Sequence, residues 1–142
     1  MAKDLRGFLA EYERENPREF CRVKKEVDPR YEVAAILTKL EEARKLPDLF
    51  YEKVKGSAFP VVTNVYSTKK KIASSIGIDP KMFRDKYIEA VENPIPPKIV
   101  SDGPVMEERV GEVDVDLRAL PMMTYHEGDA APYITAGMVL AE

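Results

Sequence analysis

The sequence predicts an α+β fold, in which an N-terminal mixed α/β domain over residues 1–93 is followed by the start of a second, β-rich domain over residues 94–142. Helical and strand-like apolar patterns alternate through the first domain. The proline-rich residues 93–97 then interrupt both patterns, because proline fits neither a helix interior nor a central strand. After this connector the apolar residues come only in short, strand-like runs.

An apolar stripe predicts the first helix. Leu5, Phe8, Leu9 and Tyr12 recur at helical spacing, so they share one face of that helix. The Asn-Pro pair at residues 16–17 ends it, because a residue before proline is disfavoured in helical geometry.

Residues 20–27 are predicted to form a strand with Cys21, Val23 and Val27 on one face. Cys21 is the only cysteine, and this pattern favours a small buried residue over a nucleophilic thiol. Since one cysteine forms no internal disulfide, the sequence indicates a reducing, cytoplasmic location. The first residues lead into a charged amphipathic segment, which is not typical of a signal peptide.

A second helix is predicted to start at residues 28–29, where aspartate caps the helix and proline takes its first position. Pro47 ends this segment. Two strands follow, residues 49–54 and 60–66, and the β-branched second one is typical of a strand covered on both faces. The apolar face of the helix is formed by four residues at helical spacing: Val33, Ile36, Leu37 and Leu40.

Two shorter helices complete the first domain. Thr68 is the predicted cap of the first and Gly77 marks its end. The basic residues 69–71 are interpreted as a solvated face of that helix. The Asp-Pro pair at residues 79–80 starts the second helix. Its apolar face is formed by Phe83, Tyr87, Ala90 and Val91.

Beyond the connector, residues 98–100 and 105–113 are predicted to be strands. Asp114 and Asp116 alternate with apolar residues, which favours a strand edge over a cation site. Residues 133–141 form a last apolar strand. Because a domain rarely ends on a strand whose partners must follow it, we expect a longer protein or a second polypeptide to pair with it.

The only histidine, His126, precedes Glu127 and Asp129, so a metal site or an acid–base group is one interpretation. Metal sites usually need three or four ligands, and the spacing does not match a helical zinc motif. A turn built on Gly128 and Asp129, with His126 and Glu127 satisfying backbone groups, is favoured. The sequence contains no glycine-rich phosphate loop, and no Ser-His-Asp set can be argued.

The composition limits the classes of partner. A formal net charge of −3 offers no broad positive field for nucleic acid. No apolar run is long enough to span a membrane. The chain lacks glutamine and has few asparagines among many charged residues, a bias typical of a thermophile.

Two stretches resemble the UbiD family of reversible decarboxylases. Residues 120–141, LPMMTYHEGDAAPYITAGMVLA, are similar to the family's G-D-x-x-P/K-Y-I-T-x-G motif with its preceding Leu-Pro pair. Residues 49–78 contain YEKVKG, FPVVTNVY and IASSIGI in the order of a second family pattern. The resemblance implies that residues 94–142 are the linker and the first strands of a split β-barrel flavin-binding domain.

The resemblance also implies a function. Family members decarboxylate α,β-unsaturated or aromatic carboxylic acids with prenylated FMN, a divalent metal such as manganese, and often potassium. A flavin prenyltransferase supplies the cofactor, and the full enzyme is expected to be a homo-oligomer. Ile134 and Thr135 are the implied contacts on the substrate side of the flavin pocket, with an ordinary barrel strand as the alternative. Gly137 would permit close backbone approach.

The family's acidic and arginine network and its metal ligands come downstream of this strand, so we expect no catalytic residue and no metal ligand here. The chain is therefore expected to be the N-terminal portion of a UbiD-like decarboxylase, inactive and without cofactor when alone. Two alternatives stay open. One is a stand-alone, non-catalytic subunit that completes a split decarboxylase with a catalytic chain, and the other is a small interaction module.

Overall fold

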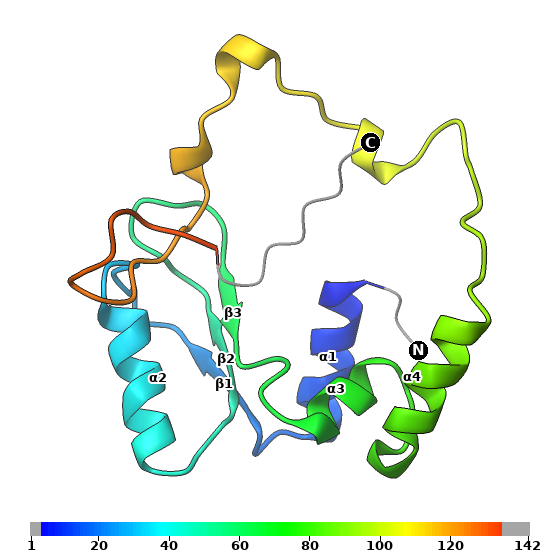
Figure 1. The fold of residues 1–142 in the computed structure, drawn as a ribbon. Coiled ribbons are helices and arrows are strands. Elements are labelled where there is room, and N and C mark those ends of the chain that lie inside the picture. The colour runs from blue at the N-terminus through cyan, green and yellow to red at the C-terminus, as the bar shows by residue number, and fades with distance from the viewer. Residues whose placement is uncertain (1–3, 135–142) are drawn as a thin grey trace. The chain divides into compact units, whose positions relative to one another are not determined.

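The computed structural model describes residues 4–134 (Figure 1). It shows helices and a three-stranded sheet, which confirms the predicted α+β class at that level. The described residues form two compact units, residues 4–67 with 118–134 and residues 68–117. No helix within residues 4–134 combines the length and the apolar character needed to cross a bilayer. The division into two domains at residues 93–97 stays a prediction.

The first unit is built on one sheet with the strand order β1-β2-β3. β1 (Phe20–Val23) runs parallel to β2 (Asp48–Tyr51), and β2 runs antiparallel to β3 (Val61–Thr63). Helix α1 (Leu5–Glu15) precedes β1, and α2 (Glu32–Glu42) connects β1 to β2 (Figure 1). Two parallel strands need such a crossover, because a tight turn cannot return the chain to the same end of the sheet.

Helix α1 forms as predicted. The Asp4 carboxylate accepts a hydrogen bond from the Gly7 N–H at 2.8 Å, which caps the first turn. The Asn16 N–H donates to the Tyr12 carbonyl at 2.8 Å where the helix ends. Leu9 and Tyr12 are the buried members of the apolar stripe.

Helix α2 begins later than predicted. Asp28 does not cap it, because α2 begins only at Glu32, and the Asp28 carboxylate accepts the Arg30 N–H at 2.9 Å within the turn before it. The Glu32 carboxylate accepts the Asp28 N–H at 2.7 Å, and Tyr31 at the helix start has a φ of 72°. The Asp-Pro pair therefore forms the turn before the helix. The helix itself was predicted correctly and buries Val33.

The strands are shorter than predicted, although their pairing continues past a gap. β1 ends at Val23 and β2 at Tyr51, and Val27 and Val54 then pair as a separate parallel bridge. The Val27 N–H donates to the Lys53 carbonyl at 3.1 Å, so the two chains stay aligned to that point.

Two buried clusters form the core of the first unit, one on each face of the sheet. Side chains alternate along a strand, so Leu49 and Tyr51 belong to one cluster and Phe50 packs against the other. The half-buried β3 also contributes to both, which confirms the two-sided cover predicted for it. The first cluster comprises Val27, Val33, Leu49, Tyr51, Val54 and Met123. The second comprises Leu9, Tyr12, Phe20 and Val65.

Cys21 is exposed, so the prediction of a buried cysteine is wrong. It shares a strand face with Val23, which packs against the first cluster. Cys21 itself lies outside both clusters. The alternating pattern identifies which residues share a face, but burial depends on which part of that face the helices cover.

The second unit begins with α3 (Lys69–Ser75), whose first turn is capped by the Thr68 hydroxyl at 3.2 Å from the Lys71 nitrogen. Gly77 follows the helix with a φ of 68°, a conformation that favours glycine. Asp79 caps a 3₁₀ turn that leads into α4 (Phe83–Glu92). These starts and stops confirm the predictions for both helices.

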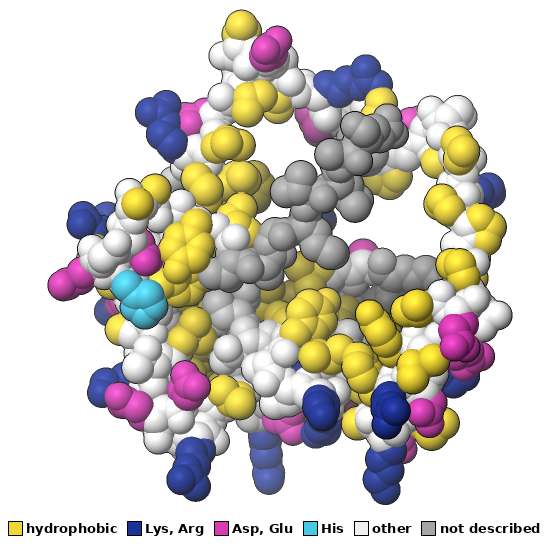
Figure 2. All heavy atoms as spheres, in the orientation of Figure 1, with side chains coloured by type: hydrophobic (Ala, Val, Ile, Leu, Met, Phe, Trp, Pro, Cys, Tyr) yellow, Lys and Arg dark blue, Asp and Glu magenta, His cyan; other side chains and the backbone are white. Residues whose placement is uncertain are grey.

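The strands predicted at residues 98–100 and 105–113 are wrong. Residues 93–103 have no helix or strand, and two 3₁₀ turns follow, Pro104–Met106 and Glu112–Asp114. A strand forms where a neighbour takes its backbone hydrogen bonds, and no strand in the part of the chain that the structure describes pairs with these residues. Ile99 and Val113 are 94% and 95% exposed. Figure 2 shows hydrophobic side chains at the surface of this region.

Candidate functional site

The predicted pocket residues follow a segment that is attached to the first unit. Ile134 is described, and 61% of it is exposed. Thr135 and Gly137 lie outside the described residues. The site is therefore built from residues 120–134, which bring the chain to Ile134.

Backbone hydrogen bonds anchor this segment next to the start of α2. The Tyr31 N–H donates to the Thr124 carbonyl at 2.9 Å, and the Thr124 N–H donates to the Pro29 carbonyl at 3.1 Å. Arg30 and Thr124 form a parallel bridge between them. Beside the bridge, Met123 is 5% exposed and belongs to the first buried cluster. A segment far along the chain thus completes the core of the first unit.

A second pairing brings Tyr133 back onto the same segment. The Tyr133 N–H donates to the Met123 carbonyl at 2.9 Å in an antiparallel bridge. The Tyr125 and Tyr133 rings lie 5.3 Å apart at an interplanar angle of 47°, a favourable tilted arrangement. Because Tyr133 is held by both contacts, the position of the adjacent Ile134 backbone is fixed relative to the core.

A turn centred on Asp129 joins the two sides of this pairing. The Asp129 carboxylate accepts the Tyr125 N–H at 2.9 Å and the His126 N–H at 2.8 Å. The Asp129 N–H donates to the His126 carbonyl at 3.1 Å. The predicted turn is confirmed, but the group that satisfies the backbone is the Asp129 carboxylate and not the side chain of His126 or Glu127.

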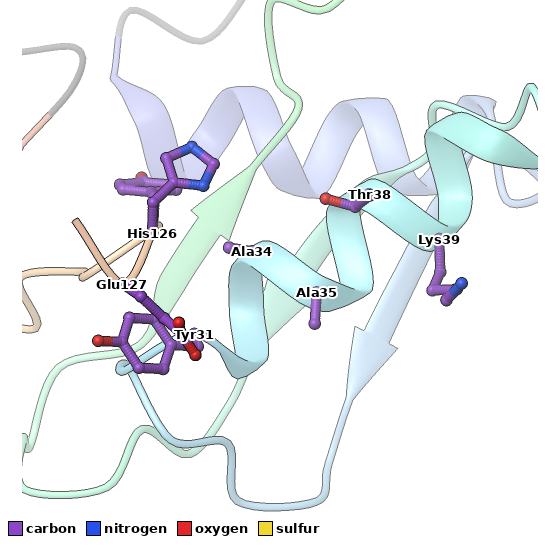
Figure 3. Close-up of a pocket in the computed structure, with 8 residues that line it drawn as sticks. Tyr31, Ala34, Ala35, Thr38, Lys39, His126 and Glu127 are labelled. Carbon is purple, nitrogen blue, oxygen red and sulfur yellow. The ribbon is translucent and has the colours of Figure 1, made fainter. Parts of the chain in front are cut away.

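An open groove of about 380 Å³ lies between α2 and this turn. Tyr31, Ala34 and Thr38 line it from α2 and its start, and His126 lines it from the turn (Figure 3). Lys39 lies at the far end of the groove from His126 and forms an ion pair with Glu42 at 2.9 Å. The groove therefore does not bring these two polar groups together. Among residues 4–134 no group of three or more His, Cys, Asp and Glu side chains is placed to hold a metal ion.

Several groups at structural contacts of the sheet and α1 have shifted pKa values. Burial raises the pKa of Tyr51, and burial together with a hydrogen bond to Glu19 raises the pKa of Tyr12. The hydrogen bond from Arg22 lowers the pKa of Glu13. These shifts belong to the packing of the sheet and α1, and they do not identify an acid–base group.

Sequence reasoning missed the residues that hold the segment. The contacts of Pro29, Arg30 and Tyr31 with Thr124 join positions far apart in the chain, and no local pattern marks them. Only Asp129 carried a signal, because aspartate after glycine is typical of a turn.

Comparison with known proteins identifies the family of this chain. Residues 12–91 match the family model described as the 3-octaprenyl-4-hydroxybenzoate carboxy-lyase N-terminal domain. Residues 98–142 match the Rift-related domain of the same carboxy-lyase. The chain belongs to the UbiD family. The family resemblance drawn from residues 49–78 and 120–141 is thus confirmed.

Two curated relatives are much longer than this chain. An uncharacterized protein of Synechocystis is 31% identical over 100% of the chain, which spans 32% of that protein. An uncharacterized protein of Rhodospirillum rubrum is 32% identical over 85% of the chain, which spans 26% of that protein. The chain therefore covers about a third or less of the length of these relatives.

Solved UbiD-class structures share the fold. An evolved dimeric form of the UbiD-class enzyme HmfF from Pelotomaculum thermopropionicum, in complex with prFMN, has a TM-score of 0.81 and 37% identity over 95% of this chain and 31% of its own. The vanillic acid decarboxylase of Sedimentibacter hydroxybenzoicus, in its closed form, has a TM-score of 0.76 and 33% identity over 94% of this chain and 29% of its own.

Proposed function

We propose that this chain is the N-terminal part of a UbiD-class decarboxylase that acts on an α,β-unsaturated or aromatic carboxylic acid. The observation that carries the proposal is the order of the two family matches, residues 12–91 followed by residues 98–142. Their limits support a domain division at residues 93–97, with a split β-barrel flavin-binding domain beginning in residues 94–142. The cytoplasmic location inferred from the single cysteine stays a prediction.

We further propose prenylated FMN as the cofactor of the whole enzyme, made by a flavin prenyltransferase. The support is the HmfF structure, which is a complex with prFMN. Ile134, Thr135 and Gly137 are the proposed pocket residues. The exposed Ile134 follows the anchored Tyr133 directly, so its side chain is available to a ligand while its backbone is held.

The described residues offer an apolar contact to the flavin and not a complete site. When bound, the prenylated flavin supplies the electron-accepting chemistry of decarboxylation. In this proposal the chain's own residues position the pocket strand. Met123 packs in the core, the Thr124 backbone hydrogen-bonds to the residues before α2, and the Asp129 carboxylate holds the turn. Manganese and potassium are not assigned to any described side chain.

A chimera tests this proposal. Residues 1–142 would replace the corresponding third of the HmfF enzyme, and decarboxylation would be measured after loading with prenylated FMN. We expect the chimera to release carbon dioxide from the HmfF substrate, and the 142-residue chain alone to give no activity and no flavin absorbance after gel filtration.

Two outcomes would count against the proposal. Tight flavin binding or decarboxylation by the 142-residue chain alone would contradict the assignment of the chain as an incomplete part. A chimera that folds and retains flavin but releases no carbon dioxide would contradict the decarboxylase assignment. Flavin occupancy separates this second result from simple misfolding.

A further inference from the structure

The Tyr125 side chain is seated on the core of the first unit. Side chains alternate along extended backbone, so Met123 and Tyr125 point to one side of their segment and Thr124 points to the other. Met123 is buried in the first cluster, and Tyr125 packs against that cluster. Burial is the main cause that raises the pKa of Tyr51, and the nearby Tyr125 phenol contributes to the same rise. Both observations place the Tyr125 ring over the buried face of the sheet.

Tyr133 meets the Tyr125 ring from the opposite segment. Because Tyr133 pairs with Met123 across an antiparallel bridge, Tyr125 is its diagonal neighbour on the same face. Aromatic side chains are long enough to reach across this diagonal, and the two rings lie 5.3 Å apart at 47°. Tyr125 therefore contacts the core on one side and Tyr133 on the other.

The backbone pairing of Tyr133 is slight without this ring contact. It is an isolated bridge, with one hydrogen bond from the Tyr133 N–H to the Met123 carbonyl at 2.9 Å. Short two-stranded pairings are only marginally stable in water. A tilted pair of aromatic rings adds a favourable contact beyond the apolar area that it buries. The ring pair is thus the contact that links Tyr133, and Ile134 after it, to the core.

We infer that Tyr125 is a positioning residue of the proposed pocket: its ring holds Tyr133 and thereby sets where the Ile134 side chain meets the flavin. The inference rests on the proposed function for its effect on catalysis, whereas the hold on Tyr133 is measurable in the chain alone. Since Tyr125 acts through Tyr133, it is not a catalytic residue. The ring is required at this position, and the hydroxyl is not.

The first experiment measures the hold in the 142-residue chain. Tyr125→Leu keeps an apolar side chain over the cluster but removes the ring. We expect hydrogen exchange at the Tyr133 amide to become about fivefold faster, measured by NMR, because the ring pair no longer supports the bridge. Tyr125→Phe keeps the ring and should retain the exchange rate of the parent chain.

Val33→Ala provides the matched control. Val33 belongs to the same buried cluster but lies on α2, so its loss weakens the core without removing the ring pair. This variant should lower the urea midpoint and leave the Tyr133 exchange unchanged under native conditions. A purely structural role of Tyr125 predicts the same result for Tyr125→Leu and Val33→Ala.

The second experiment measures catalysis in the chimera with the HmfF enzyme, loaded with prenylated FMN. Tyr125→Leu should lower kcat per bound flavin about tenfold and change KM and flavin content little, because a small displacement of a pocket contact slows the reacting step. Tyr125→Phe and Val33→Ala should retain the kcat of the parent chimera. Counting turnover per bound flavin, well below the unfolding temperature, prevents a loss of folded enzyme from producing the same result.

Three results would overturn the inference. The first is an unchanged Tyr133 exchange rate in Tyr125→Leu while circular dichroism shows a folded chain. The second is an equal increase in Val33→Ala, which indicates general loosening of the core. The third is faster exchange in Tyr125→Leu with an unchanged kcat per bound flavin. A parent chimera that retains flavin and has no activity contradicts the proposed function instead, and the exchange rates then decide alone whether Tyr125 holds Tyr133.

Discussion

At the residue scale, Asp129 and Arg22 show how single side chains hold the chain in place. The Asp129 carboxylate satisfies two backbone N–H groups of the turn before Tyr133, at 2.9 and 2.8 Å. The Arg22 guanidinium on β1 donates a bidentate hydrogen bond to the Glu13 carboxylate of α1, at 2.7 and 2.6 Å. It also lies 4.9 Å from the centre of the Phe50 ring. Asp129 thus holds a turn, and Arg22 joins β1 to α1.

Replacing Asp129 with alanine should loosen the turn. The change leaves the Tyr125 and His126 N–H groups without their acceptor, which costs about 1–2 kcal/mol of unfolding free energy. We expect faster hydrogen exchange at those two amides and at Tyr133, measured by NMR. Glu127→Ala, an exposed neighbour, is the control and should leave the three amides unchanged. Equal exchange in both variants would show that the carboxylate does not hold the turn.

The Glu13–Arg22 contact predicts a pH dependence. The hydrogen bond from Arg22 lowers the pKa of Glu13 in the folded chain, so its stabilisation is present above the unfolded pKa, near 4.3, and disappears as pH falls through the folded value. The pair is partly exposed, which limits the effect to less than about 1 kcal/mol.

Glu13→Gln should therefore lower the urea midpoint at pH 7, and the loss should shrink as the pH falls below the unfolded pKa. Glu41→Gln, at an exposed position of α2, should leave the midpoint unchanged at every pH. A loss for Glu13→Gln that does not shrink with falling pH would indicate lost packing and not a lost ion pair.

At the element scale, caps and turn residues decide where helices begin. Thr68 and Asp79 cap the predicted positions because their side chains reach N–H groups two or three residues ahead. Asp28 also precedes a proline and also accepts the N–H two residues ahead, yet Tyr31 then takes a left-handed φ of 72°, and Asp28 forms an ion pair with Lys55 at 2.8 Å. The Asp-Pro pair thus specifies a bend, and the partners available in the fold decide whether a helix starts there.

Thr68→Ala should weaken α3. The change removes the oxygen that accepts the Lys71 N–H at 3.2 Å, and loss of such a cap costs about 1 kcal/mol. We expect increased exchange of the Lys71 amide, with little change in the first unit. Ser67→Ala, one residue earlier, is the control. If both variants exchange alike, the Thr68 hydroxyl does not act as the cap.

At the scale of the whole chain, the first unit is completed by residues that come after the second unit in sequence. Met123 fills the cluster that also contains Val27, Val33 and Tyr51. The bridge between Arg30 and Thr124 and the hydrogen bond from the Ser57 hydroxyl to the Ala119 carbonyl, at 3.0 Å, hold the same segment. Stability of the core and position of the proposed pocket strand are therefore coupled.

Met123→Ala tests this coupling. Removing a buried methionine side chain typically lowers the free energy of unfolding by about 2–5 kcal/mol. Here it should also weaken the hydrogen bond from the Tyr133 N–H to the carbonyl of residue 123. Urea unfolding gives the first quantity and hydrogen exchange gives the second. Met122→Ala, half-buried beside it, is the control. Lost stability with an unchanged Tyr133 amide would separate the core from the pocket segment.

The sequence by itself determined the elements whose signals are local. The spacing of Leu9 and Tyr12, the cap at Thr68 and the left-handed Gly77 each depend on a few neighbouring residues, so a linear pattern identifies them. The family membership was also readable from ordered motifs.

Only the tertiary structure decided the rest, because it depends on which distant residues meet. The short apolar runs in 98–100 and 105–113 predicted strands, but within the described chain no strand pairs with these residues, and residues 105–113 form turns. Cys21 shares a face with Val23 yet stays exposed, and the anchoring of Thr124 beside Pro29 has no counterpart in local sequence. Burial and pairing are set by contacts across the fold, which is why composition and spacing predicted the helices better than the site.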